Sequence, residues 1–396
     1  MHFYERHGFM NSETNKKRTR LSIKLPRTVL IVICAIPIVL TILFYSLRSV
    51  TIVMSWASNN FSAPVRGFLG MLSSIYPLSV MEVLCTAAVL WLIYYLARTV
   101  AVTVHRREKM KILTKRLLPV IVAAVYLWCL FCWVWSSGYH APGFAERNGF
   151  SSGGVAAQDL VAVTRMFANK ANELSTLVKR DEDGRYVGDR REILDSATSV
   201  YQNIVAEFPD LDGKLYKPKS MMYSWLMSRT GYTGIYFALT GESNINSRAP
   251  VFLIPVTAAH ELAHQRGVFA EDEANFVGIA ASVTSGNTAY EYAGYLLGLL
   301  YLLPALSGED SETYYEIGSS LTEEVNRDWQ ENSDYWQSQR RVETGVELID
   351  NVLSVVVETM NDSVDAVYDG YLKSQKQELG IKSYGACIDL LVEYFK

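Results

Sequence analysis

Three long apolar stretches in the first third of the sequence constrain the fold more than any other feature. Residues 28–47 contain no charged side chain, residues 81–97 contain only Glu82, and residues 117–135 contain none. A helix needs about 20 predominantly apolar residues to cross the hydrocarbon core of a bilayer. A cleaved signal peptide would carry a small-residue cleavage site and would not be followed by two further apolar stretches. The pattern therefore predicts three N-terminal transmembrane helices.

The basic residues around these stretches predict their orientation. Residues 1–27 and 98–116 each hold seven Lys or Arg, whereas residues 48–75, expected to form a loop, hold only Arg48 and Arg66. Loops rich in Lys and Arg stay on the cytoplasmic side. We therefore expect a multi-pass protein of the cell membrane with a cytoplasmic N-terminus and an extracytoplasmic C-terminal domain.

Charge divides the chain at the same place. Residues 1–138 carry 16 basic and 4 acidic side chains, whereas the remainder carries 21 basic and 37 acidic side chains. An acidic domain behind a basic membrane anchor argues against nucleic acid as a partner. The basic runs are better explained as topology signals and contacts with lipid headgroups, so the lipid bilayer is an expected partner.

The motif His260-Glu261-Leu262-Ala263-His264 carries the main functional information. On a helix, positions i and i+4 share one face, so both imidazoles can converge on one ion. A catalytic Zn²⁺ accepts imidazole nitrogen and keeps one coordination position for water beside three protein ligands. Glu261 can reach that water as a general base. The motif predicts one Zn²⁺ and a metallopeptidase that hydrolyses a polypeptide near the membrane surface.

The third zinc ligand is expected to be a carboxylate. His140 is the only other histidine outside the basic segments, whereas a second helical stretch with an acidic first turn follows the motif closely. An αα-hairpin would bring the start of this stretch beside His264. We prefer Glu271, with Glu273 as the alternative, because Asn275 then lies one turn later and can form a hydrogen bond with a ligand.

Two flanking segments complete the expected domain. Residues 231–242 are β-branched and aromatic between glycines, which predicts a short strand or hairpin beside the metal helix. The edge of such a strand can hold an extended peptide by backbone pairing. Residues 290–303 are apolar, but the run of about 15 residues is short for a bilayer, so we favour a buried helix over a fourth span.

Peptide hydrolysis also needs a donor for the oxyanion. With histidines scarce, a tyrosine is expected, and Tyr384 is named first, with Tyr371, Tyr232 and Tyr236 as alternatives. Two other functions stay open, a non-catalytic zinc-binding membrane scaffold and a ligand-sensing protein. Glu261 favours catalysis, because a purely structural zinc has little need of a glutamate at this place.

Several blocks resemble a known family. They are Thr240-Gly241-Glu242, His260 to Gly267, Glu271 to Phe276, Tyr368 to Lys373 and Ser383-Tyr384-Gly385. The sequence resembles the DUF3810 family of bacterial membrane proteins, which are similar to gluzincin-type zinc metallopeptidases. In gluzincin-like peptidases the first glutamate of such a block binds zinc, which implies this role for Glu271. The separation from His264 is shorter than in many gluzincins, which leaves the choice between Glu271 and Glu273 open.

The expected architecture is mainly α. Residues 1–27 form a basic cytoplasmic N-terminus, residues 28–135 a membrane domain with three transmembrane helices, and residues 136–154 a linker. Residues 155–396 form a mostly helical, zincin-like extracytoplasmic domain with a small β-hairpin or edge sheet.

Overall fold

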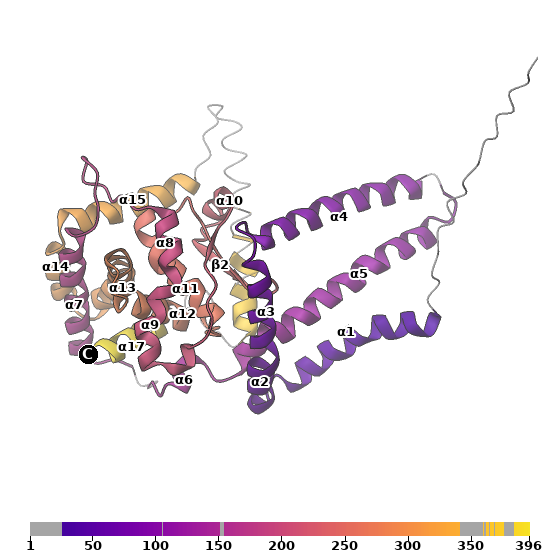
Figure 1. Cartoon of the computed structure of the whole chain (residues 1–396), viewed down its shortest axis with the longest axis horizontal. Coiled ribbons are helices and arrows are strands. Elements are labelled where there is room, and N and C mark those ends of the chain that lie inside the picture. Colours follow the sequence, from indigo (N-terminus) through magenta and orange to yellow (C-terminus); the bar gives the residue numbers. More distant parts are fainter. Residues whose placement is uncertain are drawn as a thin grey trace, which may run out of the picture.

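The computed structural model describes residues 26–104, 106–150, 154–340 and 384–396, together with 359, 362–363, 365–367 and 369–375. Three long helices extend from one side of a helical domain (Figure 1). They are α1 (Arg27–Leu47), α4 (Val80–Val104) and α5 (Lys109–Val134).

Two of the three expected membrane spans are found among the described residues. Among the described residues, α4 and α5 are long and apolar enough to cross a membrane, by length and composition. The apolar part of α1 that the structure describes is Ile31–Leu47. This helix packs along α5, where the Trp133 indole donates a hydrogen bond to the Leu40 carbonyl at 3.1 Å.

The segment expected as a loop between the first two apolar stretches is helical. It consists of α2 (Thr51–Ala57), the π-helical turn η1 (Ser58–Ser62) and α3 (Ala63–Ser73). Small and polar side chains on one face are buried against the helical domain, among them Ser58, Ser62 and Gly70. Residues 51–73 therefore belong structurally to the domain and not to an exposed connection.

The domain is a cluster of helices with one small sheet. In chain order its elements are η2 (Ser136–His140), α6 (Phe144–Arg147), α7 (Ala157–Ser175), α8 (Arg190–Ser196), η3 (Ala197–Val200), α9 (Tyr201–Glu207), η4 (Pro209–Leu211), β1 (Lys219–Ser220), α10 (Ser224–Arg229), β2 (Gly234–Phe237), β3 (Glu242–Ile245), η5 (Val251–Leu253), α11 (Ile254–Gln265), α12 (Glu271–Val283), α13 (Thr288–Glu309), α14 (Ser311–Ser319), α15 (Glu323–Arg340) and α17 (Tyr384–Phe395).

The apolar stretch at residues 290–303 forms a buried core helix, as favoured from its length. It lies within α13, which packs against α7, α11, α12 and α17 (Figure 1). Leu296, Leu299 and Leu302 are completely buried there. Burying a leucine side chain contributes about 1.5–3 kcal/mol to stability. The packing of α13 therefore stabilises the positions of α11 and α12.

The expected hairpin is present and belongs to a three-stranded sheet. Strand order is β1-β3-β2, with β1 parallel and β2 antiparallel to β3. The β1 strand was not expected, because two residues carry no recognisable alternation. Since β3 packs against α11 and lies between the edge strands β1 and β2, the sheet lies beside α11.

Buried charged side chains connect the domain to α3 and α4. The Glu242 carboxylate of β3 accepts hydrogen bonds from Val80 N–H at 3.0 Å and Met81 N–H at 2.9 Å, at the start of α4. In return, Glu82 of α4 accepts hydrogen bonds from two backbone N–H groups before α10. Lys219 pairs with Glu242 and donates to the Ser73 carbonyl at 2.7 Å, at the end of α3. Each carboxylate satisfies N–H groups that a helix end leaves open.

Residues 136–150, expected as part of a linker, pack against the domain. Ser137 and Gly138 of η2 are buried, and Phe144 of α6 is completely buried among aromatic side chains. The end of α5 is therefore held directly on the domain.

Candidate metal centre

The helix α11 carries both histidines of the motif. Ala258, Ala259 and Ala263 are completely buried, and alanine is the strongest helix former. The helix begins with Pro255 in its first turn, and the chain reverses at Gly267, whose φ of 81° suits a glycine. The imidazole rings of His260 and His264 have centroids 4.8 Å apart.

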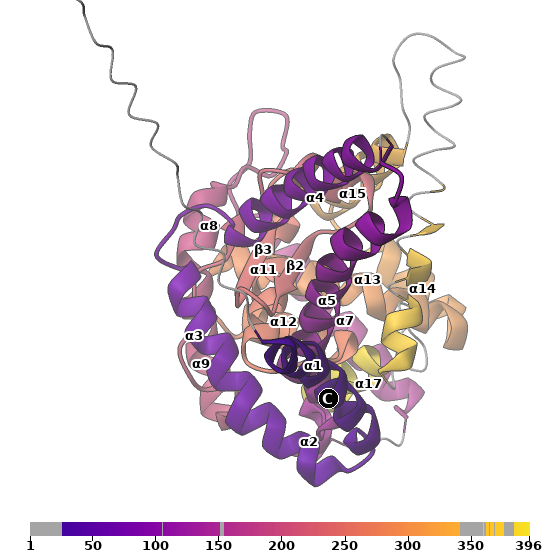
Figure 2. The same ribbon diagram turned by 90° about the vertical axis from the view of Figure 1, so that its right-hand side faces the viewer.

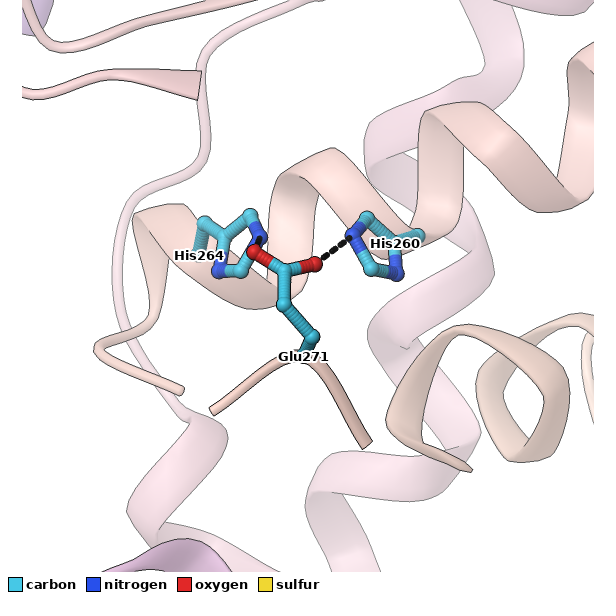
Figure 3. A group of neighbouring side chains, drawn as sticks. All are labelled: His260, His264 and Glu271. Atoms are coloured by element: carbon cyan, nitrogen blue, oxygen red, sulfur yellow. Dashed lines mark ion pairs between the residues drawn. The ribbon is translucent and has the colours of Figure 1, made fainter. Parts of the chain in front are cut away.

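The carboxylate of Glu271, the first residue of α12, lies between the two imidazoles (Figure 3). Its Oε2 is 3.4 Å from His260 Nε2, and its Oε1 is 3.7 Å from His264 Nε2. One ligand atom from each of these residues lies within 4.8 Å of the others. With zinc–ligand bonds of about 2.0–2.1 Å, ligand atoms of a tetrahedral site are about 3.3 Å apart. The three side chains therefore fit a single Zn²⁺.

Close packing of α12 on α11 sets this geometry. A Cβ at Gly278 of α12 would lie 2.9 Å from the backbone nitrogen of His260, so a larger residue would push the helices apart. Because Glu271 begins α12, separating the helices would also move its carboxylate away from the imidazoles.

Hydrogen bonding selects the nitrogen of His264 that faces the site. Nδ1 lies 2.7 Å from the Val268 carbonyl and donates to it, which leaves Nε2 as an acceptor. Burial lowers the pKa of His264 to about 4, so the ring is neutral near pH 7. A neutral imidazole is the form that binds a metal.

The environment of His260 favours positive charge at the centre. Burial acts to lower its pKa, but the hydrogen bond with Glu271 and the charges of Glu261 and Glu271 outweigh burial and raise it. Asn275 contributes a side-chain hydrogen bond to His260 in the same direction. The Asn275 contact places this amide where it was expected, beside a candidate ligand.

Glu273, the alternative ligand, lies elsewhere. Its carboxylate accepts hydrogen bonds from Phe144 N–H at 2.8 Å and Ala145 N–H at 2.9 Å, at the start of α6. A Cβ at Gly143 would lie 2.4 Å from Glu273 Oε1. Glu273 therefore connects α12 to α6 through hydrogen bonds. Glu271, and not Glu273, lies beside the two histidines.

Glu261 is buried between α11 and the edge strand. The backbone N–H of Tyr236 donates to its carboxylate, while the Glu261 carbonyl accepts a hydrogen bond from Ser243 of β3 at 2.8 Å. Burial raises the pKa of Glu261 to about 8. Its Oε2 has no hydrogen-bond partner among the described residues. Such a carboxylate can take up a proton near neutral pH.

The edge strand β2 runs next to Glu261. Asn246 N–H donates to the Thr233 carbonyl at 2.9 Å, so in the antiparallel register the backbone groups of Gly234 and Tyr236 face away from β3. A Cβ at Gly234 would lie 2.4 Å from Glu261 Oε1, so glycine permits the close approach. This edge is the part of the sheet that a bound peptide could extend.

Three tyrosines are affected by the charge of Glu271, and one of them was not expected. Burial raises the pKa of Tyr139, Tyr232 and Tyr371, and the negative charge of Glu271 adds to this effect. Of these, Tyr139 carries no motif that the sequence could have revealed. Tyr384 begins α17, but its side chain lies outside the described residues, so its predicted role stays a prediction.

Two further residues contact the centre from the front part of the chain. Arg66 of α3 donates a hydrogen bond to the His264 carbonyl at 3.0 Å, and its guanidinium lies over the Phe269 ring. Trp135, directly after α5, packs its ring against that of His264. The only sequence signal for Arg66 is that residues 49–81 contain no other charge.

Comparison with known proteins places the chain in a family. The family model described as "Protein of unknown function (DUF3810)" matches residues 58–392. The chain belongs to the DUF3810 family. The match begins at the first residue of η1 and includes His260, His264 and Glu271 of the candidate metal centre in this DUF3810 protein. No curated protein and no solved structure matches the chain.

Proposed function

We propose that this DUF3810 protein is a membrane-anchored zinc metallopeptidase. The observation that carries the proposal is the convergence of His260, His264 and Glu271, with ligand atoms within 4.8 Å of one another, beside the buried carboxylate of Glu261. A structural zinc site is usually closed by four protein ligands, whereas three ligands leave one position for water.

Each residue of the centre would have a separate role in peptide hydrolysis. His260, His264 and Glu271 would hold one Zn²⁺, which would polarise the scissile carbonyl and lower the pKa of water. Glu261 would accept a proton from the attacking water at its carboxylate and return it to the leaving amine. A tyrosine hydroxyl would stabilise the oxyanion, and Tyr139, Tyr232 and Tyr371 join Tyr384 as candidates.

The substrate class follows from the edge strand. An extended polypeptide would pair with the outward carbonyls of Gly234 and Tyr236, whereas the Tyr236 N–H is bound by Glu261, and this pairing would align its scissile bond beside Glu261. This arrangement supports the similarity to gluzincin-type, zincin-like peptidases.

The membrane anchor would place the centre close to the bilayer surface. We propose a multi-pass protein of a bacterial cell membrane, with α4 and α5 as spans, α1 as a shorter third span, a cytoplasmic N-terminus and an extracytoplasmic domain. Because Trp135 follows the last residue of α5 and touches His264, the centre would act on polypeptides close to the bilayer surface.

The decisive experiment compares cells that produce wild-type protein, Glu261→Gln or Glu309→Gln. Membrane and secreted peptides would be compared by mass spectrometry. The first change removes the general base and retains the expected zinc ligands, while Glu309 is an exposed residue at the end of α13. Cleavage products should disappear in Glu261→Gln only.

A different result would reject catalysis. If the products are unchanged and Glu261→Gln restores the wild-type phenotype while His260→Ala does not, the centre is non-catalytic. The protein would then be a zinc-binding membrane scaffold or a ligand-sensing protein.

A further inference from the structure

The helical segment α2–η1–α3 lies across the bases of the long helices. It runs from Thr51 to Ser73, between α1 and α4 in the chain. Figure 1 shows α2 and α3 crosswise to the direction in which α1, α4 and α5 extend, and Figure 2 shows α2 and α3 lengthwise while α1 is nearly end-on. The 23 residues are about 34 Å long.

One face of this segment is used by the protein. Arg66 donates to the His264 carbonyl, Ser62 donates to the Val134 carbonyl at the end of α5, and a Cβ at Gly70 would lie 3.0 Å from the Gly241 carbonyl. The buried positions Ser62, Arg66 and Gly70 are four residues apart, which is one helical turn. This face therefore fits the domain closely.

The exposed surface of the segment consists mainly of large apolar side chains, with the uncharged Asn59 and Asn60 among them. Their exposed fractions are 83% for Ile52, 64% for Trp56 and 56% for Phe68, and Ile75, which follows α3, is 70% exposed. Residues 49–81 contain one charged side chain, Arg66, and it is buried on the opposite face. A helix facing water normally presents charged and polar residues there.

The apolar face continues into the membrane helices. Val83 and Leu84, at the beginning of α4, expose 49% and 56% of their surface immediately beyond the domain. Met222 and Trp225, beside the point where Glu82 accepts hydrogen bonds from the backbone, are also exposed. Residues 74–78, which connect α3 to α4, are also exposed and uncharged, so the apolar residues of α3 and of the beginning of α4 are joined by an uncharged exposed segment.

We propose that α2–η1–α3 lies in the plane of the lipid bilayer, with its apolar face in the boundary between headgroups and acyl chains. An amphipathic helix lies in this position when one face is apolar, and tryptophan is favoured at this depth. The occupant is lipid because the face continues the exposed surface of a candidate span. The inference rests on the membrane location of α4, but it does not depend on peptidase activity.

The test uses the full chain reconstituted in phosphatidylethanolamine–phosphatidylglycerol vesicles. Nitroxide labels are attached at Trp56→Cys or Phe68→Cys after Cys34 and Cys85, the two cysteines that are not buried, are replaced by alanine. Collisions of each label with oxygen, which concentrates in lipid, and with a water-soluble nickel complex are measured by electron paramagnetic resonance. Leu177→Cys is the matched water control, because Leu177 is also 64% exposed and follows α7, away from the long helices (Figure 1).

Labels at 56 and 68 should collide mainly with oxygen, and the label at 177 mainly with the nickel complex. Nickel collisions at 56 and 68 equal to those at 177 would place the face in water and overturn the inference. Low collision rates with both reagents would mean that protein covers the face, such as a second copy, which also overturns it. A label at Leu90 of α4 separates these failures, since nickel collisions there would refute the membrane span itself.

Discussion

Trp135 and His264 lie edge to face, with ring centroids 5.7 Å apart. The indole belongs to the residue after α5, and the imidazole is a candidate zinc ligand. The end of a candidate membrane helix therefore contacts the candidate metal centre. Movements or substitutions at the end of α5 will therefore affect the position of His264.

The first prediction concerns the zinc ligands. Purified wild-type protein should hold about one zinc per chain, by the ligand count of a catalytic site. His264→Ala and Glu271→Gln should lose it, because each removes one of the three converging atoms. Elemental analysis of the purified variants measures the stoichiometry.

Glu273→Gln is the control that separates the two glutamates. It should retain zinc but weaken two hydrogen bonds at the start of α6, at a cost of about 1–3 kcal/mol. The expected result is a lower Tm with one zinc per folded chain. Zinc lost in Glu273→Gln and kept in Glu271→Gln would reverse the assignment.

A second prediction concerns Gly234. In Gly234→Ala the new Cβ would meet Glu261 Oε1 at 2.4 Å and displace the carboxylate. A misplacement of about 1 Å can reduce turnover about 100-fold. The cleavage products that disappear in Glu261→Gln should form about 100-fold more slowly in Gly234→Ala, while zinc stays bound. Gly308→Ala, at an exposed helical glycine with open space around it, should leave both unchanged. Equal activity in the two variants would show that Glu261 does not depend on this close approach.

The third prediction concerns Arg66. Arg66→Met removes the hydrogen bond to the His264 carbonyl. Loss of a contact that orients a ligand weakens metal binding about 10–100-fold, and competition with a zinc chelator measures this change. Arg191→Met, at a side chain that is 88% exposed, should bind zinc like the wild type. Unchanged zinc affinity in Arg66→Met would limit the arginine to a packing role.

Topology gives the fourth prediction. A reporter active only outside the cytoplasm should be active when fused after Gly154 and after Lys396, because the domain between them contains no candidate span among its described residues. Activity after Gly154 alone would mean that the chain crosses the membrane again within the domain.

The sequence predicted local features of the centre and missed those that depend on tertiary packing. His260 and His264 are one helical turn apart, and Glu271 follows a short reversal, so their convergence depends on few residues. Burial of α13 was predictable from the length of its apolar run. The hydrogen bonds of Glu273 to α6 were not, because they join positions about 130 residues apart, and neither was the contact of Arg66 with residue 264.

The structure of residues 51–73 shows the same limit. Hydropathy identified all three long apolar helices, of which α4 and α5 are candidate spans among the described residues, but it did not identify the helices between α1 and α4. The helical form of residues 51–73 depends on a face of small residues that packs on a domain encoded later in the chain.

Glu82, Lys219 and Glu242 form hydrogen bonds between the domain and the helices α3 and α4. These bonds limit how the protein can be purified. Removing the chain before Val155 would remove the helix ends that Lys219 and Glu242 bind and expose the surface that these helices cover. Hydrogen bonds to charged groups contribute about 1.5–3 kcal/mol each. Proteolytic release of the domain would therefore destabilise it. Purification has to keep the whole chain in detergent or lipid nanodiscs.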